Sequence, residues 1–478
     1  MGVLWKLNFA DPVLMLLMAM RAVESVVIPI LISDRVAKDL GIANYTHMET
    51  TPCVIRNSTD EQLVQSAASQ WAMAYWLASS LPGALTAVLI GGWSDRIGRR
   101  TPMLLALTGY AIEAMFAMAT VHWNLHLAYL IAGSVIEGIC GSYPTVLLAV
   151  YAHASDSSEP RKRTSRLLLL SLLEFFGVGV FNLVAGELLK YYGVFTTECT
   201  VLGGHLVGIL YAGFLLADTR GKHGEDPLTE HRPSIQDSSK DSDSITTATG
   251  RDVRSYSHSV LKTFRLVLRP WPKRRQLLIL LFCFELVVMN FLGISDVTVL
   301  YTEHTPLCWP STRIGYFNAI KYGCLVIAQA IVSPLILRVQ PPDRYVAQVA
   351  LLAVIAYFVV CAFSHTTLQM YLGAACMFFA APCIATMRSM MSKLVPSSDH
   401  GAVFATIASL ETIITVLATV IYNNLYSYVI HQDKYPVLPN NGSVCLLLAA
   451  GLNFLPVFLM SFVPARSTPS GYEPLAGD

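Results

Sequence analysis

Residues 91–100 read Gly-Gly-Trp-Ser-Asp-Arg-Ile-Gly-Arg-Arg and lie between two long apolar stretches. The three arginines concentrate positive charge, and such clusters mark the cytosolic loops of membrane proteins. Gly98 allows a tight turn between two helices. Asp95 can meet the arginines, or the end of a neighbouring helix, in a latch that is made and broken. We interpret the stretch as this latch. The alternative is a loop whose charge only sets the orientation in the membrane.

The composition of the whole chain agrees with a membrane location. Of its 478 residues, 54% are hydrophobic and 14% are charged, whereas soluble domains carry about 25% charged residues. The mean hydropathy is +0.51, and the apolar runs are continuous rather than alternating, which argues against a β-barrel. The net charge of +1 gives no sign of a nucleic-acid partner. We therefore expect an all-α integral protein of the lipid bilayer.

Apolar windows of the length that crosses a bilayer, about 20 residues, predict twelve helices. They lie near residues 12–33, 69–92, 102–121, 127–151, 166–187, 199–216, 275–301, 313–338, 345–364, 368–388, 402–425 and 443–463. Residues 1–216 and 275–464 then form two six-helix halves. We expect residues 217–274 to form a polar, largely disordered cytosolic linker and residues 465–478 a cytosolic tail.

The loops predict the orientation. Lys and Arg are concentrated in the even-numbered loops and scarce in the odd-numbered ones, which places the even loops and both termini in the cytosol. Three Asn-x-Ser/Thr sequons fall on the opposite side, as glycosylation requires: Asn44, Asn57 and Asn441. Cys53 and Cys308 share that oxidising side, one in each half, so the arrangement is compatible with a disulfide between the halves. No cysteine spacing predicts a metal site.

Ionisable residues inside membrane helices are costly and usually functional. Glu174 lies in the apolar run Leu-Leu-Glu-Phe-Phe, which makes it a candidate proton carrier; the alternative is a structural hydrogen bond. Arg21 and Glu24 are three residues apart and are expected to pair on one helix face, in a structural or a functional role. Lys321 or Arg388 would hold an anionic substrate, and the fork of an arginine suits a carboxylate better. The remaining intramembrane ionisable residues are Glu113, Glu137, Glu187, Glu285, Asp296 and Glu411.

Residues 91–100 resemble the signature of the major facilitator superfamily at every position. The positions that carry it are Gly91, Asp95, Arg96, Gly98, Arg99 and Arg100. Two six-helix halves joined by a polar cytosolic linker are the outline of a secondary transporter built from repeats. The resemblance implies a twelve-helix fold in which the latch stabilises the outward-open state and is released during alternating access.

Two further regions resemble solute carrier family 46, the proton-coupled folate transporter and its relatives. Residues 305–309, Thr-Pro-Leu-Cys-Trp, with Ile-Gly-Tyr at 314–316, look like that family's signature from loop 7 to helix 8. Residues 388–395, together with 401–404 and 410–412, are similar to its lysosomal branch. The resemblance covers nearly the whole chain and implies proton-coupled import of organic anions.

Taken residue by residue, the resemblance implies that Glu174 is the proton-coupling glutamate and that Arg388 takes part in proton and substrate binding. It also implies a disulfide between Cys53 and Cys308. The candidate substrate-binding residues are Arg21, Glu24, Glu137, Phe291, Lys321, Arg388 and Glu411. The expected coupling ion is the proton, and no cofactor is expected.

Several positions depart from the folate carrier. Ser134 and Ser142 stand where that carrier has an arginine and an aspartate, and Phe291 stands where it has a histidine. Arg21 and Glu24 stand where relatives have neutral residues. We therefore predict bulky organic anions, such as muropeptides or steroid conjugates, as substrates in preference to folate.

The tail resembles a sorting signal. Tyr472 and Leu475 form a Tyr-x-x-apolar motif shortly after the last predicted helix, the short form that clathrin adaptors read. This arrangement favours an endolysosomal membrane, with the plasma membrane as the alternative. An acidic lumen would supply protons to Glu174 and drive export of the solute into the cytosol.

Three other functions remain open at this point: a folate transporter, a proton-independent facilitator, and a transceptor or scaffold that signals through the linker and the tail. Deleting the linker separates the last of these from a carrier, because a carrier should lose little flux. An enzyme is not expected, since the sequence shows no nucleophile–base pair, metal spacing or phosphate loop.

Overall fold

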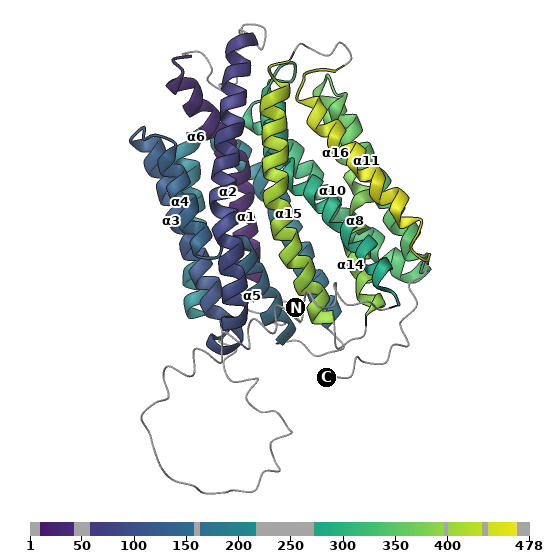
Figure 1. Ribbon diagram of the computed structural model, residues 1–478. Coiled ribbons are helices and arrows are strands. Elements are labelled where there is room, and N and C mark those ends of the chain that lie inside the picture. Colours follow the sequence, from purple (N-terminus) through teal and green to yellow (C-terminus); the bar gives the residue numbers. More distant parts are fainter. Residues whose placement is uncertain are drawn as a thin grey trace, which may run out of the picture.

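The computed structural model describes residues 10–42, 58–156, 163–216, 272–395, 400–432 and 438–465, and the regular structure among them is helical (Figure 1). The first half contains α1 (Asp11–Asp39), α2 (Ser58–Ile97), α3 (Arg100–His122), α4 (Ala128–Ile139), α5 (Ser142–Asp156) and α6 (Arg163–Phe214). The second half contains α8 (Arg274–Gly293), α9 (Ser295–Glu303), α10 (Ser311–Val339), α11 (Asp343–Ala362), α12 (Thr367–Ala375), α13 (Met377–Ala380), α14 (Pro382–Leu394), α15 (His400–Val429) and α16 (Ser443–Met460). The all-α fold is thus confirmed.

Ten helical segments of the described residues are long and apolar enough to cross a membrane. α2 is not among them, and the predicted helices 166–187 and 199–216 form the single element α6, which contains the non-helical Gly193 (φ 72°, ψ 178°). The 43 residues from Leu172–Phe214 would measure about 65 Å as one helix, roughly twice the hydrocarbon core. Two arms that meet at Gly193 therefore fit a bilayer better than one straight helix. The count of twelve helices, and the side that faces the cytosol, stay predictions.

Three of the predicted helices contain a break. α4 and α5 are separated at Gly141, whose φ is 107°. α8 ends at Gly293 and α9 begins at Ser295, while the predicted helix 368–388 is divided among α12, α13 and α14. Each interrupted pair or triplet still forms one apolar segment of membrane-spanning length.

The stretch 91–100 is mostly helical rather than a loop. α2 continues to Ile97, beyond the predicted end near residue 92. Gly98 has a φ of 92°, a conformation that is costly for any residue with a side chain, and α3 begins two residues later. The expected tight turn at Gly98 is present. The side chains of residues 91–97 lie outside the described residues, so the latch stays a prediction.

Two helix pairs make the most extensive contacts between the halves. Within the first half, α1 and α3 pack against α6, and within the second, α11 packs against α16 and α8 against α15. Between the halves, α10 packs along α6 and α15 packs along α2. Figure 1 shows α2 and α15 side by side in the centre of the bundle. The halves are thus separate helix bundles with two seams between them.

The apolar cores of the two halves are joined at one end of the bundle only. One cluster of buried side chains includes residues of both halves, such as Val64 and Leu130 with Trp309 and Tyr426. Two smaller clusters at the other end each belong to one half among the described residues. We call the joined end, which contains Glu61, the sealed end, and the other the Gly98 end. The described structure is therefore a state in which the halves are packed together at the sealed end.

Candidate functional site

Glu174 lies on α6 and receives hydrogen bonds from two tyrosines of α5. The Tyr143 hydroxyl donates to its Oε1 at 2.9 Å, and the Tyr151 hydroxyl donates to its Oε2 at 3.5 Å. The carboxyl group also lies within electrostatic range of Arg388 and Glu411 in the other half. The structure therefore gives Glu174 the hydrogen bonds of the alternative interpretation and also places it within electrostatic range of charges in the other half.

Arg388 and Glu411 form an ion pair between α14 and α15. Nη2 of Arg388 lies 3.0 Å from Oε2 of Glu411, and the two side chains are 42% and 29% exposed. The guanidinium lies 5.1 Å from the centre of the Phe284 ring. Glu285 on α8 is in electrostatic range of the pair, and no described protein group donates to its buried carboxyl oxygens. A partly exposed ion pair contributes little stability, so another carboxylate could replace Glu411 at small cost.

Lys321 and Phe291 lie together, as two of the predicted substrate-binding residues. The Lys321 ammonium on α10 lies 4.7 Å from the centre of the Tyr322 ring, 5.9 Å from that of Phe317 and 6.0 Å from that of Phe291. Such cation–π contacts favour the charged amine. Tyr322 is in turn within electrostatic range of Glu174. An aromatic surface with one cation thus adjoins the proton-carrier candidate.

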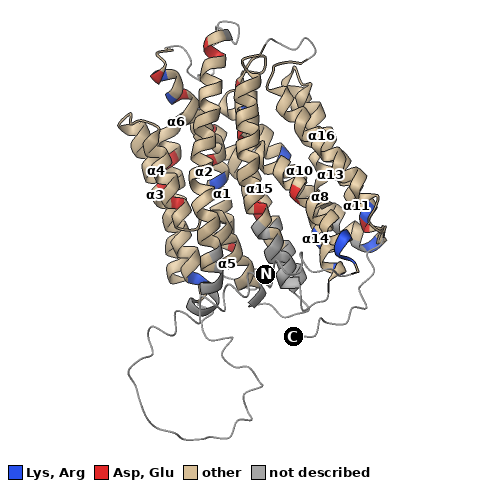
Figure 2. Ribbon diagram, viewed as in Figure 1, with Lys and Arg blue, Asp and Glu red and all other residues tan. Residues whose placement is uncertain are grey.

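Arg21 and Glu24 lie within electrostatic range of each other, and each also contacts other side chains. Arg21 donates a hydrogen bond to the Tyr110 hydroxyl, and its guanidinium lies 5.2 Å from the centre of the Tyr143 ring. Oε1 of Glu24 lies 3.3 Å from Nε2 of His205. Figure 2 shows acidic and basic positions part-way along the helices of the first half.

Glu137, another predicted substrate-binding residue, is buried on α4. It accepts a hydrogen bond from the Ser79 hydroxyl of α2. Ser142 lies 3.2 Å from the same hydroxyl, and Ser134 donates to the backbone oxygen of Tyr75 at 2.7 Å. The two serine positions thus fill hydrogen-bonding roles between helices and bring no charge to the centre of the molecule.

Several predicted site residues lie outside the described residues: Asn44, Asn57, Cys53, Tyr472 and Leu475. Cys308 is disulfide-bonded, but its pairing with Cys53 stays a prediction for that reason. Asn441 is buried, and its Nδ2 donates to the backbone oxygen of Gln432 at 2.6 Å. The atom that would carry a glycan is therefore occupied in this conformation.

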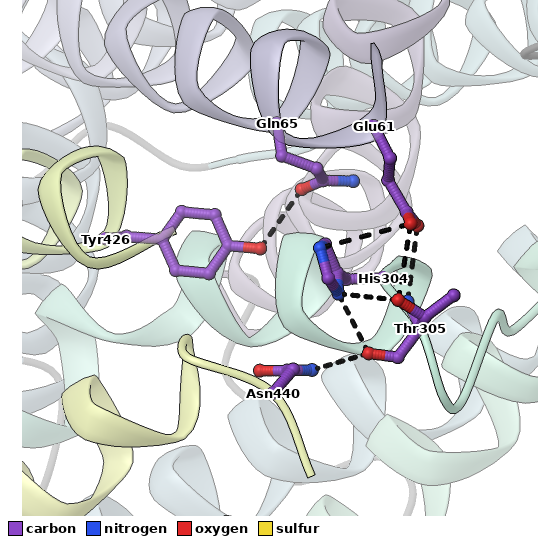
Figure 3. A network of polar contacts seen from close by, with 6 residues as sticks. All are labelled: Glu61, Gln65, His304, Thr305, Tyr426 and Asn440. Carbon is purple, nitrogen blue, oxygen red and sulfur yellow. Dashed lines mark hydrogen bonds and ion pairs between the residues drawn. The ribbon is translucent and has the colours of Figure 1, made fainter. Parts of the chain in front are cut away.

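The sequence analysis missed a polar network at the sealed end, shown in Figure 3. Glu61 of α2 accepts hydrogen bonds from the backbone N–H and the hydroxyl of Thr305, both at 3.2 Å. His304 lies 4.0 Å from Glu61, and Asn440 donates to the backbone oxygen of Thr305 at 3.1 Å. These contacts close the first half onto the second. Glu61 was missed because the predicted helix began only near residue 69.

The seam between α2 and α15 continues the network. The hydroxyls of Ser66 and Ser427 lie 2.7 Å apart, and Ser69 donates to the backbone oxygen of Asn423 at 2.8 Å. The Tyr426 hydroxyl donates to Gln65 at 3.1 Å (Figure 3). A polar stripe of Gln65, Ser66 and Ser69 at helical spacing is the signal that could have revealed this contact. Among the described residues, no group of three or more metal-binding side chains occurs.

Comparisons with known proteins agree with this architecture. The sequence matches the Major Facilitator Superfamily over residues 13–419. It is 27% identical over 435 residues to the proton-coupled folate transporter of Rattus norvegicus, and this alignment covers 89% of this chain and 85% of the relative. It is 29% identical over 408 residues to the lysosomal proton-coupled steroid conjugate and bile acid symporter SLC46A3 of the same species, with 84% and 81% covered. Both relatives agree with the motif resemblance to solute carrier family 46.

Solved structures show the same fold at low sequence identity. The D-xylose-proton symporter has a TM-score of 0.63 at 14% identity, with 97% of this chain and 98% of that chain covered. The human organic anion transporter MFSD10 (TETRAN) has a TM-score of 0.61 at 18% identity, with 95% and 98% covered.

Proposed function

From the premise that this chain belongs to the Major Facilitator Superfamily, we propose that it moves bulky organic anions into the cytosol together with protons, by alternating access. A protein of this family is a multi-pass membrane transporter and not an enzyme. Its relatives are proton-coupled, which supports the proton as the coupling ion. The substrate class, the direction and the residues that act are the parts we propose.

One observation carries the proposal: Glu174 of the first half is in electrostatic range of the Arg388–Glu411 pair of the second half. An ionised Glu174 attracts Arg388 and competes with an anionic substrate for it. Protonation removes this competitor. Binding of a proton and binding of an anion therefore favour each other, which is the linkage that symport requires. The seams keep the two halves in register while they rock about the site.

The surroundings of the two cations favour an anion with an apolar body. Phe284 lies beside Arg388, and Phe291 and Tyr322 lie beside Lys321. Aromatic faces bind flat or steroid-like surfaces well, while the guanidinium takes a carboxylate or sulfate in a bidentate contact. The relatives include a folate transporter and a steroid conjugate and bile acid symporter. We favour the second class because Ser134 and Ser142 carry no charge.

We further propose an endolysosomal location. It is supported by the lysosomal relative and by the Tyr472 motif, through which a clathrin adaptor would sort the protein. In such a membrane the acidic lumen protonates Glu174 from the sealed end after that end opens. The plasma membrane is the alternative; there the protons would come from the extracellular fluid, which lies on the same side of the protein as the lumen.

The test uses Tyr472→Ala protein, which should accumulate at the cell surface if the tail is a sorting signal. Uptake of labelled steroid conjugates, muropeptides and folates is measured at acidic and neutral external pH. We expect uptake to rise as the pH falls and to lose this dependence in Glu174→Gln. Glu187→Gln is the matched control, because this glutamate lies on the same helix but is exposed and bonded to Tyr316.

Two outcomes would overturn parts of the proposal. Uptake that is indifferent to pH in the parent protein would identify a facilitator without proton coupling. No uptake of any compound by protein confirmed at the surface would favour a scaffold, and loss of a signalling output on deletion of residues 217–274 would then support that reading.

A further inference from the structure

We infer that the first half contains a second proton-binding site, separate from Glu174, in which Glu24 and Glu113 share a proton beside Arg21. The presence of this proton does not depend on the proposed function. Its contribution to coupling does rest on the proposed function. The site is built by side chains of α1, α2, α3, α4 and α6, within the bundle of the first half.

The site holds more acidic groups than its cations can balance. Four glutamates from four helices are almost completely buried: Glu24 (3% exposed), Glu113 (2%), Glu137 (2%) and Glu198 (0%). The described cationic candidates that face them are Arg21 and, if protonated, His205. Burying several ionised carboxylates beside one guanidinium would cost several kcal/mol for each unpaired charge. Some of these groups must therefore be neutral, that is, protonated.

The contacts indicate where one proton lies. Glu24 and Glu113 are both buried and lie within electrostatic range of each other. Two ionised carboxylates would repel each other, and neither could donate to the other, because an ionised carboxylate only accepts. Tyr75 donates to Oε1 of Glu113 at 2.8 Å, and no described protein group donates to its Oε2. A shared proton is what satisfies the pair.

The other acidic groups differ from this pair. Neither carboxyl oxygen of Glu198 has a described donor, so a fully buried Glu198 is expected to remain neutral. Glu137 accepts one hydrogen bond from Ser79, and Cys140 lies within its electrostatic range. Asp296 of α9 lies within electrostatic range of Arg21 from the second half. Among the described acidic groups of this cluster, Glu24 and Glu113 are therefore the pair that we expect to share a proton.

A continuous set of contacts leads from this pair to Glu174. Glu24 lies beside His205, whose ring stacks on Tyr110 with 5.2 Å between the ring centres. The hydroxyl of Tyr110 accepts a hydrogen bond from Arg21. Arg21 then lies over the ring of Tyr143.

Tyr143 completes the connection, because its hydroxyl donates to Glu174 at 2.9 Å. Loss of the shared proton would leave a negative charge close to Arg21 and draw the guanidinium away from the Tyr143 ring. The two proton sites are therefore expected to influence each other. Tyr143 is a positioning residue in this scheme, since it acts on the proton site through its hydrogen bond to Glu174.

The first test needs no substrate. Infrared difference spectra of the purified full-length protein, recorded between acidic and alkaline pH, detect the carbonyl band of protonated carboxylic acids. Glu174→Gln protein should retain a pH-dependent band that arises from the remaining site. The double variants Glu174→Gln with Glu24→Gln, and Glu174→Gln with Glu113→Gln, should each lose it. Glu174→Gln with Glu187→Gln is the control and should keep it.

Two results would overturn the inference. One is the absence of any pH-dependent carboxyl band in Glu174→Gln protein, a measurement that leaves the cluster itself intact and so avoids any folding defect of the cluster variants. The other is a band that persists in both double variants when they elute as folded monodisperse protein.

The role in coupling is tested separately in liposomes. The proton-to-substrate ratio, measured from the gradient at which net flux stops, should fall in Glu113→Gln relative to the parent protein. Tyr143→Phe should keep this ratio and shift the pH at which flux is half-maximal. An unchanged ratio in folded Glu113→Gln would contradict the coupling role. If no variant transports anything, the proposed function has failed while the infrared result still decides the proton site.

Discussion

The two halves of this protein hold their charges in opposite ways. In the first half, Glu24 and Glu113 are almost completely buried, and Glu113 accepts a hydrogen bond from a tyrosine. In the second half, Arg388 and Glu411 are 42% and 29% exposed and form a direct ion pair. A buried acidic cluster can exchange protons but cannot admit a large ion, whereas a partly exposed ion pair can exchange its partner. The difference supports our proposal that the first half handles protons and the second half handles the anion.

Among single substitutions, Arg388→Ala should weaken substrate binding most. The variant removes the group that we expect to hold the anion, and hydrogen bonds to charged groups contribute about 1.5–3 kcal/mol. We therefore expect apparent substrate affinity to fall by about tenfold to a hundredfold. The measurement is the concentration dependence of uptake. Arg388→Lys should lie between the two, because it keeps the charge and loses the fork. Equal affinity in Arg388→Ala would place the anion elsewhere.

A smaller effect is expected from a substitution in the seam between α6 and α10, along which the two halves pack. A Cβ at Gly315 of α10 would lie 2.5 Å from the backbone oxygen of Asn182 on α6. Gly315→Ala should force the helices apart and lower the stability by about 1–3 kcal/mol, measured as a lower melting temperature in detergent. Gly323→Ala on the same helix is the control, because nothing lies within 4 Å of its Cβ. Equal melting temperatures for both variants would mean that α6 and α10 can move apart to accommodate the added methyl group without a loss of stability.

Substitution of Glu411 should change substrate affinity least. Glu411→Gln removes the anion's competitor for Arg388. Since exposed ion pairs contribute about 0.2–1 kcal/mol, substrate affinity at neutral pH should rise by at most about fivefold. The quantity to measure is the ratio of affinities at neutral and acidic pH. A loss of affinity would show that Glu411 orients the arginine and does not compete with the substrate.

The residues at the centre of the molecule were predictable because intramembrane charge is rare. Glu174 and Arg388 stood out in apolar runs, and the structure brings them within electrostatic range. The contact of Glu24 with His205 could not be predicted, because helical spacing reports only neighbours on one helix. His205, which lies beside Glu24, comes from α6, far away in the sequence. The sequence around a residue does not indicate which helices, distant along the chain, it will contact.

The helix count and the sealed end show the same limit. Hydropathy finds apolar segments, so it discarded the polar start of α2 and with it Glu61. Gly193 interrupts α6 by one backbone conformation and lies in the gap between the predicted helices 166–187 and 199–216, but hydropathy did not show that the helix continues on both sides of it. The expected turn at Gly98 was accessible from the sequence because a glycine followed by arginines combines two independent signals.

The sealed end has a consequence for how the cell controls the protein. In the proposed cycle, Arg388 is open to the Gly98 end while the Glu61 network holds the halves together, and the loop charges assign that end to the cytosol. If Arg388 holds the substrate as proposed, other cytosolic anions compete for it after the substrate has left. We therefore expect trans-inhibition: a high concentration of anions in the cytosol should slow the return of the empty carrier.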